Sequence, residues 1–272
     1  MQKNSPHFIG IGTAYAGIGV LAKLLTSHPE ISNSIPSLNF FNTDIYDRKG
    51  IAWYDANFQT LNNRKLTGEF SVGYLSGGPE VAEKIFQFYP KTKLFAIIRH
   101  PLDRAIAQYE HVKQFKSGQR YRNCSEYLTA VPTAQTVGLY GQHLRNYFGY
   151  FSYLQLQVII YEDLLREPLK VIQELYNFLE IDNNYLPRAL ATFAPKPAEP
   201  KHRGLVAKGL HFPIKLVKQV MEKKPPQIFQ PTFKISDYFS EMELVPFKKL
   251  YAEDASRLTP LVHRNLVAEW DL

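Results

Sequence analysis

The chain opens with a strongly apolar stretch, residues 8–25 (FIGIGTAYAGIGVLAKLL), that contains two different periodicities. Its first residues are almost all apolar, as in a buried strand. From Ile18 onward, apolar residues return every three or four positions, as on one face of a helix. Glycines separate the two patterns, and they allow the backbone to take a positive φ or to approach another group closely. The stretch therefore predicts a strand, a loop and a helix.

The same alternation of apolar runs and amphipathic stretches continues downstream. Strands are predicted over 66–76 (with a turn), 93–101 and 154–164, and helices over 50–62, 79–89, 102–115, 139–151 and 166–180. Strands that alternate with helices form a parallel sheet that helices cover on both faces. We therefore expect an α/β fold: a P-loop-like three-layer domain with a central parallel sheet of about five strands.

Residues 193–231 depart from this pattern, because they are rich in Pro and Lys and show little periodicity. They predict an irregular, lid-like segment that faces the substrate. Residues 239–270 then predict C-terminal helices that pack back on the body of the molecule. A chain of 272 residues can build one large core. We expect a single domain over residues 1–272.

The composition is that of an ordinary soluble protein, with 45% hydrophobic and 21% charged residues. No apolar run approaches the roughly 18 residues of a membrane-spanning helix. No long apolar region precedes the first strand, so we expect no secretory signal. The single cysteine, Cys124, excludes an internal disulfide and has no partners of a catalytic triad nearby. Together these features favour a cytoplasmic protein.

The net charge of +7 and the pI near 9.2 favour anionic partners such as nucleotides or sulfated glycans. No nucleic-acid recognition motif accompanies this charge, so a nucleic-acid partner is not expected. The eight histidines are scattered without metal-ligand spacing, so no metal is expected either.

Candidate chemistry begins in the first loop, where Gly12 and Gly17 have the spacing of a phosphate loop. Exposed amides and the helix dipole at such a position bind phosphate or sulfate. The next residues are Ile18 and Gly19 instead of the Lys and Ser/Thr of a kinase, so that class is disfavoured. A dinucleotide-binding oxidoreductase is disfavoured too, because Tyr15 occupies the third glycine position of its fingerprint. The loop predicts an anion cradle without its usual cation.

Four blocks of the sequence resemble, in order and spacing, the sulfotransferases that use 3′-phosphoadenosine 5′-phosphosulfate (PAPS), in particular the heparan-sulfate type and its bacterial relatives. The blocks are residues 12–31, 50–58, 68–75 followed by 93–111, and 138–168. The resemblance implies transfer of a sulfuryl group from PAPS, as co-substrate, to a hydroxyl of a glycan or small metabolite. It implies no metal.

The resemblance also assigns nucleotide-binding roles. It implies that the backbone amides of residues 15–19 cradle the 5′-phosphosulfate and that Arg99 holds the 3′-phosphate, for which a guanidinium fork is well suited. An ion pair with Asp103 or Glu110 is the structural alternative for Arg99, and it is the expected role of Arg104. The nucleotide-binding positions are Gly12, Thr13, Tyr15, Ala16, Gly17, Ile18, Gly19, Arg99 and Ala107.

The chain departs from the family at the positions that carry chemistry. The family's loop lysine corresponds to Tyr15, and its carboxylate base corresponds to Ser37. A second lysine is replaced by Phe70, and the serine that follows the phosphate-binding arginine is replaced by Ala107. Losing one transition-state donor costs on the order of 100- to 1000-fold in rate. The catalytic positions are therefore Tyr15 and Ser37, both substituted.

Two hypotheses follow from these substitutions. In the first, the protein is an active sulfotransferase in which Lys201 or Lys208 supplies the missing charge and Glu69 or His111 acts as the base. In the second, the protein is a catalytically inactive member of the family that binds nucleotide or glycan, or that supports an active partner.

Overall fold

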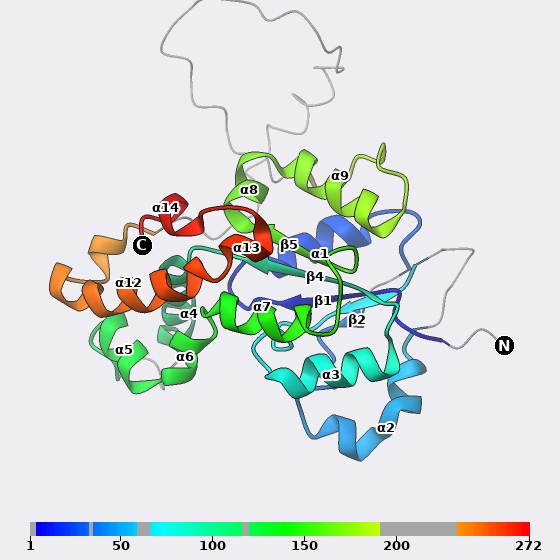
Figure 1. Ribbon diagram of the computed structural model, residues 1–272, viewed down its shortest axis with the longest axis horizontal. Coiled ribbons are helices and arrows are strands. Elements are labelled where there is room, and N and C mark those ends of the chain that lie inside the picture. The colour runs from blue at the N-terminus through cyan, green and yellow to red at the C-terminus, as the bar shows by residue number, and fades with distance from the viewer. Residues whose placement is uncertain (1–3, 33–34, 59–65, 116–119, 191–232) are drawn as a thin grey trace, which may run out of the picture.

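The computed structural model describes residues 4–32, 35–58, 66–115, 120–190 and 233–272. Its centre is a parallel sheet of five strands in the order β2-β3-β1-β4-β5 (Figure 1). The strands are β1 (Phe8–Gly12), β2 (Ile35–Pro36), β3 (Gly68–Phe70), β4 (Lys93–Ile98) and β5 (Leu156–Ile160). Four of them contain three to six residues, whereas β2 contains only two. The expected α/β fold with a parallel sheet is confirmed.

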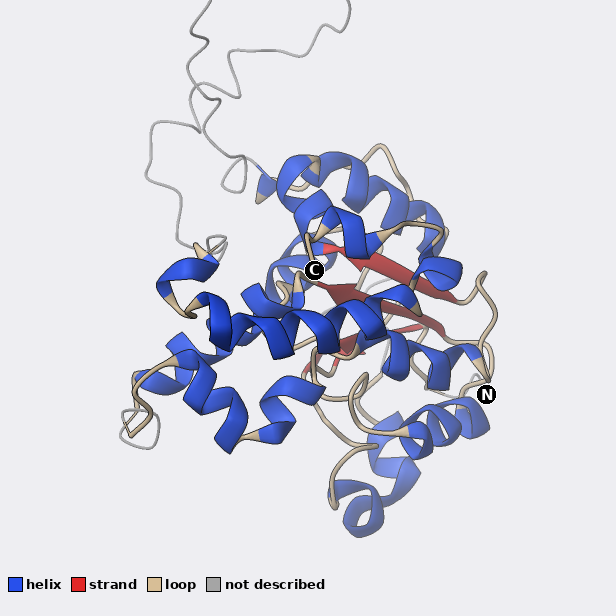
Figure 2. Cartoon of the chain, turned by 60° about the vertical axis from the view of Figure 1, so that its left-hand side comes forward, coloured by secondary structure: helices blue, strands red, loops and turns tan. Residues whose placement is uncertain are grey.

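Helices cover both faces of this sheet (Figure 2). The first half of the chain forms α1 (Ile18–Thr26), α2 (Ile45–Asp55), α3 (Pro79–Phe88), α4 (Pro101–Lys113), α5 (Cys124–Ala130) and α6 (Pro132–Thr136). The second half forms α7 (Tyr140–Phe148), α8 (Tyr161–Arg166), α9 (Pro168–Leu179), the 3₁₀ turn η1 (Ile235–Asp237), α12 (Glu241–Ser256), α13 (Thr259–Val262) and α14 (Leu266–Glu269).

Alternate side chains of β4 enter two separate cores, because successive residues of a strand point to opposite faces. Leu94, Ala96 and Ile98 pack in one core with side chains of α3 and α7. Phe95 and Ile97 pack in the other with side chains of α1 and α9. The strand is buried on both faces, as a central strand of a parallel sheet should be. The three expected layers are therefore present.

Several element boundaries differ from those expected. The helix expected over 50–62 begins at Ile45 and ends at Asp55, and Gly50, at φ 71°, interrupts it. The strand expected over 154–164 ends at Ile160, because α8 begins at Tyr161. The lid-like segment expected over 193–231 lies outside the described residues. No helix among those described is both long enough and apolar enough to cross a membrane.

Helices α5 and α6, together with α4 and α12, enclose a third group of apolar side chains. Leu102 of α4, Leu128 of α5, Ala134 of α6 and Phe247 of α12 lie in this group. α12 therefore packs beside helices that are more than a hundred positions away in sequence. This arrangement brings the C-terminal helices to the end of the sheet where β4 becomes α4 (Figure 1).

Candidate nucleotide site

The glycine-rich loop lies at the carboxyl end of the central strands, where parallel α/β sheets bind ligands. It connects β1 to α1, and the amide of Thr13 donates a hydrogen bond to the carbonyl of Ile97 on β4, at 2.9 Å. Gly17 precedes α1 with φ 90°. A Cβ at Gly17 would lie 2.5 Å from the ring of Tyr161. Both the backbone conformation and the close contact therefore require glycine at this position.

The loop presents unused hydrogen-bond donors. Among the described residues, no acceptor contacts the amides of Tyr15, Gly17, Ile18 and Gly19. The amide of Ala16 differs, because it donates to the carbonyl of Thr13 at 3.3 Å. The buried hydroxyl of Thr13 also has no partner in this part of the chain. Free amides at a helix N-terminus attract an anion, so the geometry of the loop is compatible with the anion cradle, which stays a prediction.

Arg99 directly follows β4, beside this loop, and its side chain is fully buried. Its Nη1 donates to the carbonyl of Tyr15 at 3.4 Å, and its guanidinium lies 4.8 Å from the ring centroid of Tyr161. Its Nη2 lies 3.8 Å from a carboxylate oxygen of Asp103, so the expected alternative, an ion pair, is also present. Burial raises the pKa of Asp103 to about 6, against the opposing effect of Arg99.

Arg104 is fully buried as well, but its expected ion pair with Asp103 or Glu110 is absent from the described residues. One guanidinium nitrogen donates to Gln108 at 2.8 Å, and another donates to the carbonyl of Ala134 on α6. Glu110 contacts Lys113 instead, at 3.5 Å. Arg104 faces α6, not the solvent side of α4, and its positive charge therefore stays without a carboxylate partner in the described part of the chain.

Tyr15, the residue that the resemblance aligns with the family's lysine, is half-buried, with a φ of 65°. Its ring contacts the ring of His111 on α4, with a centroid distance of 5.6 Å, and His111 is exposed. Burial raises the pKa of the Tyr15 phenol, and the charge of Arg104 opposes that effect. The phenol is therefore protonated at neutral pH and can donate a hydrogen bond.

The other substituted positions contribute no charge. Phe70 is buried at the end of β3, and its ring contacts Phe8 and Phe95. Ala107 is buried on α4. Ser37 follows β2 and is exposed. The positions where the family has a second lysine, a serine and a carboxylate thus offer a core aromatic ring, a methyl group and a hydroxyl.

Glu69 is the centre of a buried polar network that the sequence does not reveal. It lies on β3 and accepts hydrogen bonds from the hydroxyls of Tyr54 (2.5 Å), Ser71 (2.7 Å) and Tyr74 (2.8 Å). The amide of Leu38 also donates to it, at 3.3 Å. Burial raises its pKa, and these hydrogen bonds lower it. Glu69 is fully enclosed by its donors, so it holds neighbouring segments together instead of facing an acceptor.

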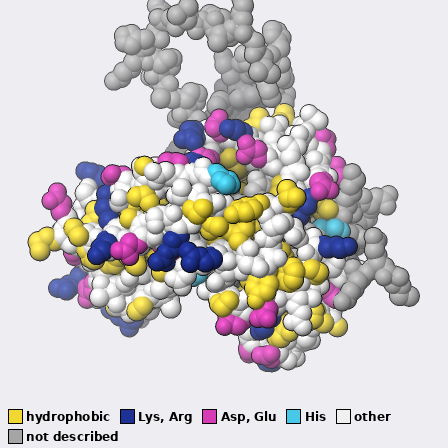
Figure 3. Space-filling model, in the orientation of Figure 1, with side chains coloured by type: hydrophobic (Ala, Val, Ile, Leu, Met, Phe, Trp, Pro, Cys, Tyr) yellow, Lys and Arg dark blue, Asp and Glu magenta, His cyan; other side chains and the backbone are white. Residues whose placement is uncertain are grey.

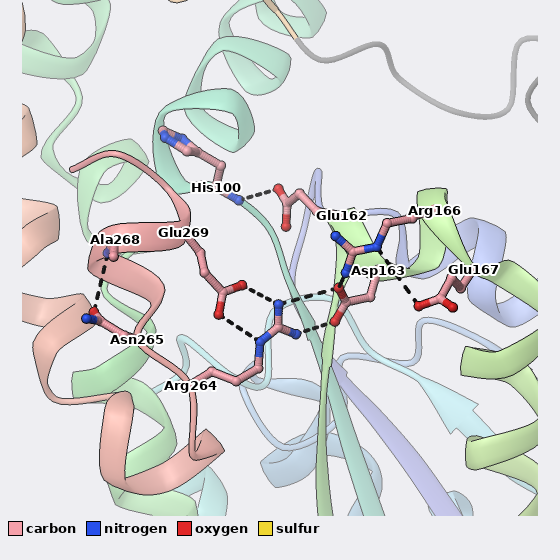
Figure 4. Close-up of polar contacts among 9 residues, drawn as sticks. All are labelled: His100, Glu162, Asp163, Arg166, Glu167, Arg264, Asn265, Ala268 and Glu269. Atoms are coloured by element: carbon pink, nitrogen blue, oxygen red, sulfur yellow. Dashed lines mark hydrogen bonds and ion pairs between the residues drawn. The ribbon is translucent and has the colours of Figure 1, made fainter. Parts of the chain in front are cut away.

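A second network surrounds His100 (Figure 4), and it too joins segments far apart in sequence. The amide of His100 donates to Glu162 at 2.9 Å, and its Nε2 lies 2.7 Å from the carbonyl of Trp270. Burial lowers the pKa of His100 to about 4, so the ring is neutral at pH 7. In that state Nε2 carries the proton that it donates to Trp270, and Nδ1 accepts from the amide of Asp103 at 3.4 Å.

A hollow in the described part of the molecule does not coincide with these groups. It measures about 440 Å³ and lies at the amino-terminal ends of β1 and β4, between His7, Tyr89, Lys93 and Leu179. The loop and both buried arginines lie at the opposite ends of the strands. Basic and acidic side chains are interspersed over the face in Figure 3, so surface charge on that face does not locate a site either. The candidate site is instead indicated by the hydrogen-bond donors at the carboxyl ends of the strands.

A three-layer α/β fold with a donor-lined loop and a buried arginine at the carboxyl ends of its central strands is typical of proteins that bind nucleotides and phosphates. Residues 82–193 match the family model described as the sulfotransferase domain. The chain is 30% identical over 213 residues to the bifunctional heparan sulfate N-deacetylase/N-sulfotransferase 4 of Mus musculus, which covers 70% of this chain and 24% of that protein. It is also 30% identical over 187 residues to the heparan sulfate glucosamine 3-O-sulfotransferase 5 of Homo sapiens. That match covers 65% of this chain and 54% of the human protein. The chain belongs to the sulfotransferase family.

Solved structures support the same fold. A sulfotransferase from Alicyclobacillus acidocaldarius superposes with a TM-score of 0.71 at 21% identity, covering 98% of this chain and 99% of that one. Mouse sulfotransferase SULT7A1 complexed with PAP superposes with a TM-score of 0.59 at 14% identity, covering 98% and 88%. The matched region is about a quarter to a half of the curated relatives' length.

Proposed function

We propose that this protein transfers a sulfuryl group from PAPS to a hydroxyl of a glycan or small-metabolite acceptor. The observation that carries the proposal is the convergence of free loop amides and the buried Arg99 at one edge of the sheet. We further propose that residues 1–272 form one domain and that the protein acts in the cytoplasm, where Cys124 stays reduced. Burial raises the pKa of that thiol to about 12, so it is unreactive.

The described residues fit the two anionic ends of the nucleotide. The amides of Tyr15, Gly17, Ile18 and Gly19, which contact no acceptor in the described part of the chain, would hold the 5′-phosphosulfate. The hydroxyl of Thr13, likewise without a partner among these residues, would lie beside them. Arg99 would hold the 3′-phosphate with its forked guanidinium. When bound, PAPS supplies the sulfuryl group, and the chain supplies binding, orientation and charge. No metal has a role in this scheme.

Negative charge develops on the leaving phosphate when the sulfuryl group is transferred, and preorganised donors stabilise it. In this chain the neutral Tyr15 phenol would donate a hydrogen bond to the leaving phosphate. The positive charge of the buried Arg104 favours this role, because it offsets part of the rise in pKa that burial causes and so strengthens the phenol as a donor. His111 is the better candidate base, because it is exposed beside Tyr15 whereas Glu69 is enclosed. Lys201 and Lys208 lie outside the described residues.

A second candidate function is a catalytically inactive protein that binds nucleotide or glycan, or that supports an active partner. The observation that favours it is the surroundings of Phe70 and Ser37. Phe70 belongs to the core, so no cation can take its place without loss of packing. Ser37 is exposed, but its hydroxyl cannot take the acceptor's proton as a carboxylate at this position would.

Calorimetric titration with the product nucleotide, 3′-phosphoadenosine 5′-phosphate (PAP), tests both candidates. We expect micromolar affinity that is lost in Arg99→Ala and unchanged in Arg166→Gln, a control at an exposed arginine. Transfer from radiolabelled PAPS to a panel of hydroxyl acceptors, increased by Tyr15→Lys, would support the enzyme. Binding without transfer, even in Tyr15→Lys, would support the inactive member, and no binding at millimolar PAP would overturn both nucleotide-based functions.

A further inference from the structure

The turn between β4 and α4 carries Arg99, and the next residue, His100, is fixed on three sides. Its amide donates to Glu162 of α8, its Nε2 donates to the carbonyl of Trp270, and its Nδ1 accepts from the amide of Asp103. The last contact caps α4, as side-chain acceptors do at helix N-termini. The carbonyl of His100 also accepts from the amide of Arg104 on α4, at 2.9 Å, so every polar group of His100 holds the turn to another element.

The segment that supplies the Trp270 carbonyl is itself attached to α8. Arg264 donates to Asp163, the neighbour of Glu162, and also to Glu269 (Figure 4). The Trp270 side chain is buried, and its ring lies 6.1 Å from that of His100. Residues 264–271 and the start of α8 therefore form one connected support around His100.

We propose that residues 264–271 are a positioning element of the nucleotide site, in which His100 transmits their placement to Arg99. The inference rests on the proposed PAPS function and deepens it, because it assigns a role in nucleotide affinity to a segment outside the loop. A forked guanidinium binds phosphate only in a narrow range of orientations, and Arg99 is bonded covalently to the residue that the segment holds. Thermodynamic linkage then requires that bound nucleotide stabilise the docked segment to the same extent.

A purely structural role would make a different prediction. If the contacts of His100 only stabilise the fold, their loss lowers the melting temperature but leaves the affinity of the folded protein for PAP unchanged. If they position Arg99, their loss weakens PAP binding at temperatures where the protein is still fully folded. Affinity measured well below the melting temperature separates the two roles.

His100→Asn is the most selective variant, because the shorter side chain can still cap α4 through its oxygen but does not reach the Trp270 carbonyl. We expect about tenfold weaker PAP binding, the effect of one lost hydrogen bond on the bound geometry. Arg264→Gln should weaken binding in the same direction. Arg166→Gln is the matched control, because Arg166 also contacts Asp163, at 2.5 Å, but comes from the same helix. Its PAP affinity should equal that of the unaltered protein.

The reciprocal effect can be read from Trp270 itself. The chain has two tryptophans, so Trp53→Phe leaves Trp270 as the single emitter. Saturating PAP should change its emission and slow amide exchange over residues 266–271, and His100→Asn should abolish both effects. If the unaltered protein binds PAP but His100→Asn and Arg264→Gln bind it equally well, the positioning role is wrong and the proposed function stands. If the unaltered protein does not bind PAP, both are wrong.

Discussion

Gly17 and Gly19 lie two residues apart at the start of α1, but their surroundings differ. A Cβ at Gly17 would meet the Tyr161 ring, whereas a Cβ at Gly19 would meet no atom within 4 Å. Gly17 also has φ 90°, and Gly19 lies inside α1. Packing and backbone conformation therefore require glycine at position 17, whereas neither requires it at position 19.

We predict that Gly17→Ala lowers the free energy of unfolding by about 2 kcal/mol or more, because it adds a clash and a strained φ. Gly19→Ala should be neutral or stabilising by up to about 1 kcal/mol, since alanine favours helix. Urea denaturation of both variants measures the difference. Equal losses at the two positions would contradict this interpretation of the loop.

His100 provides a pH-dependent prediction. In the unfolded chain it titrates near its ordinary pKa of 6.5, whereas burial lowers its pKa in the folded protein to about 4. Between these values the unfolded state binds more protons, so the stability that neutral His100 contributes is lost as the pH falls. Asparagine does not titrate.

We therefore expect the stability difference between the unaltered protein and His100→Asn to be largest near pH 7 and to shrink between pH 6.5 and about 4. Denaturation curves for the two proteins at several pH values measure it. A difference that stays constant through this window would mean that folding does not shift the protonation of His100.

At the scale of elements, the segment after β2 is held by side chains of the β3 region. The amides of Leu38, Asn39 and Phe40 donate in turn to Glu69, Ser71 and Tyr74. These bonds fix the residues that directly follow Ser37, on the side of the site where the family has its base. The two-residue strand β2 pairs only briefly with β3, and these side-chain hydrogen bonds extend the attachment beyond the end of the strand.

Removing one hydroxyl from this network should be costly. We predict that Tyr74→Phe destabilises the protein by about 2 kcal/mol, because it leaves the buried Phe40 amide without its acceptor and removes one of the donors to Glu69. Tyr176→Phe is the control: its hydroxyl is buried and has no partner among the described residues. That change should be neutral or slightly stabilising. Thermal denaturation that ranks the two variants in the opposite order would contradict the role of the network.

The sequence predicts the elements whose pattern is local and misses those that depend on distant partners. The apolar run of β4 and the periodicity of α9 identify both elements to within a few residues. Helices α5 and α6 are short, and they are stabilised by packing against α4 and α12, which no local pattern encodes. At the site, the position of Arg99 follows from the strand that it ends.

The partners of Glu69, Arg104 and His100 could not be predicted in the same way. Each of them contacts residues from a segment that only the folded chain brings near, such as Leu38, the carbonyl of Ala134 or that of Trp270. Arg104 shows the limit most clearly. The nearby carboxylates in the sequence suggest an ion pair, but the helix turns the guanidinium toward α6 instead.

At the scale of the whole molecule, two fully buried arginines place positive charge at one end of a sheet in a protein of net charge +7. Buried charge is costly unless an opposite charge compensates it. Asp103 compensates Arg99 in part, at 3.8 Å. A bound anion would bring a further opposite charge to this end of the sheet and so stabilise the whole fold.

We predict that PAP at about 100 times its dissociation constant stabilises the protein by about 2.7 kcal/mol, which raises the melting temperature by several degrees. Arg99→Lys keeps the charge but loses the fork, so the shift should shrink while the melting temperature without nucleotide changes less. High salt should also reduce the shift. A shift of the same size in Arg99→Lys would mean that Arg99 does not contact the nucleotide.

The contact between Gly17 and Tyr161 also has an evolutionary consequence. A residue with a side chain at position 17 would clash with the ring of Tyr161 at the start of α8 whether or not a nucleotide ever binds. Selection for folding alone is then enough to retain this glycine after chemistry has been lost. In descendants of such a protein this glycine would persist after the activity is lost, so its presence alone would not show that the protein still transfers a sulfuryl group.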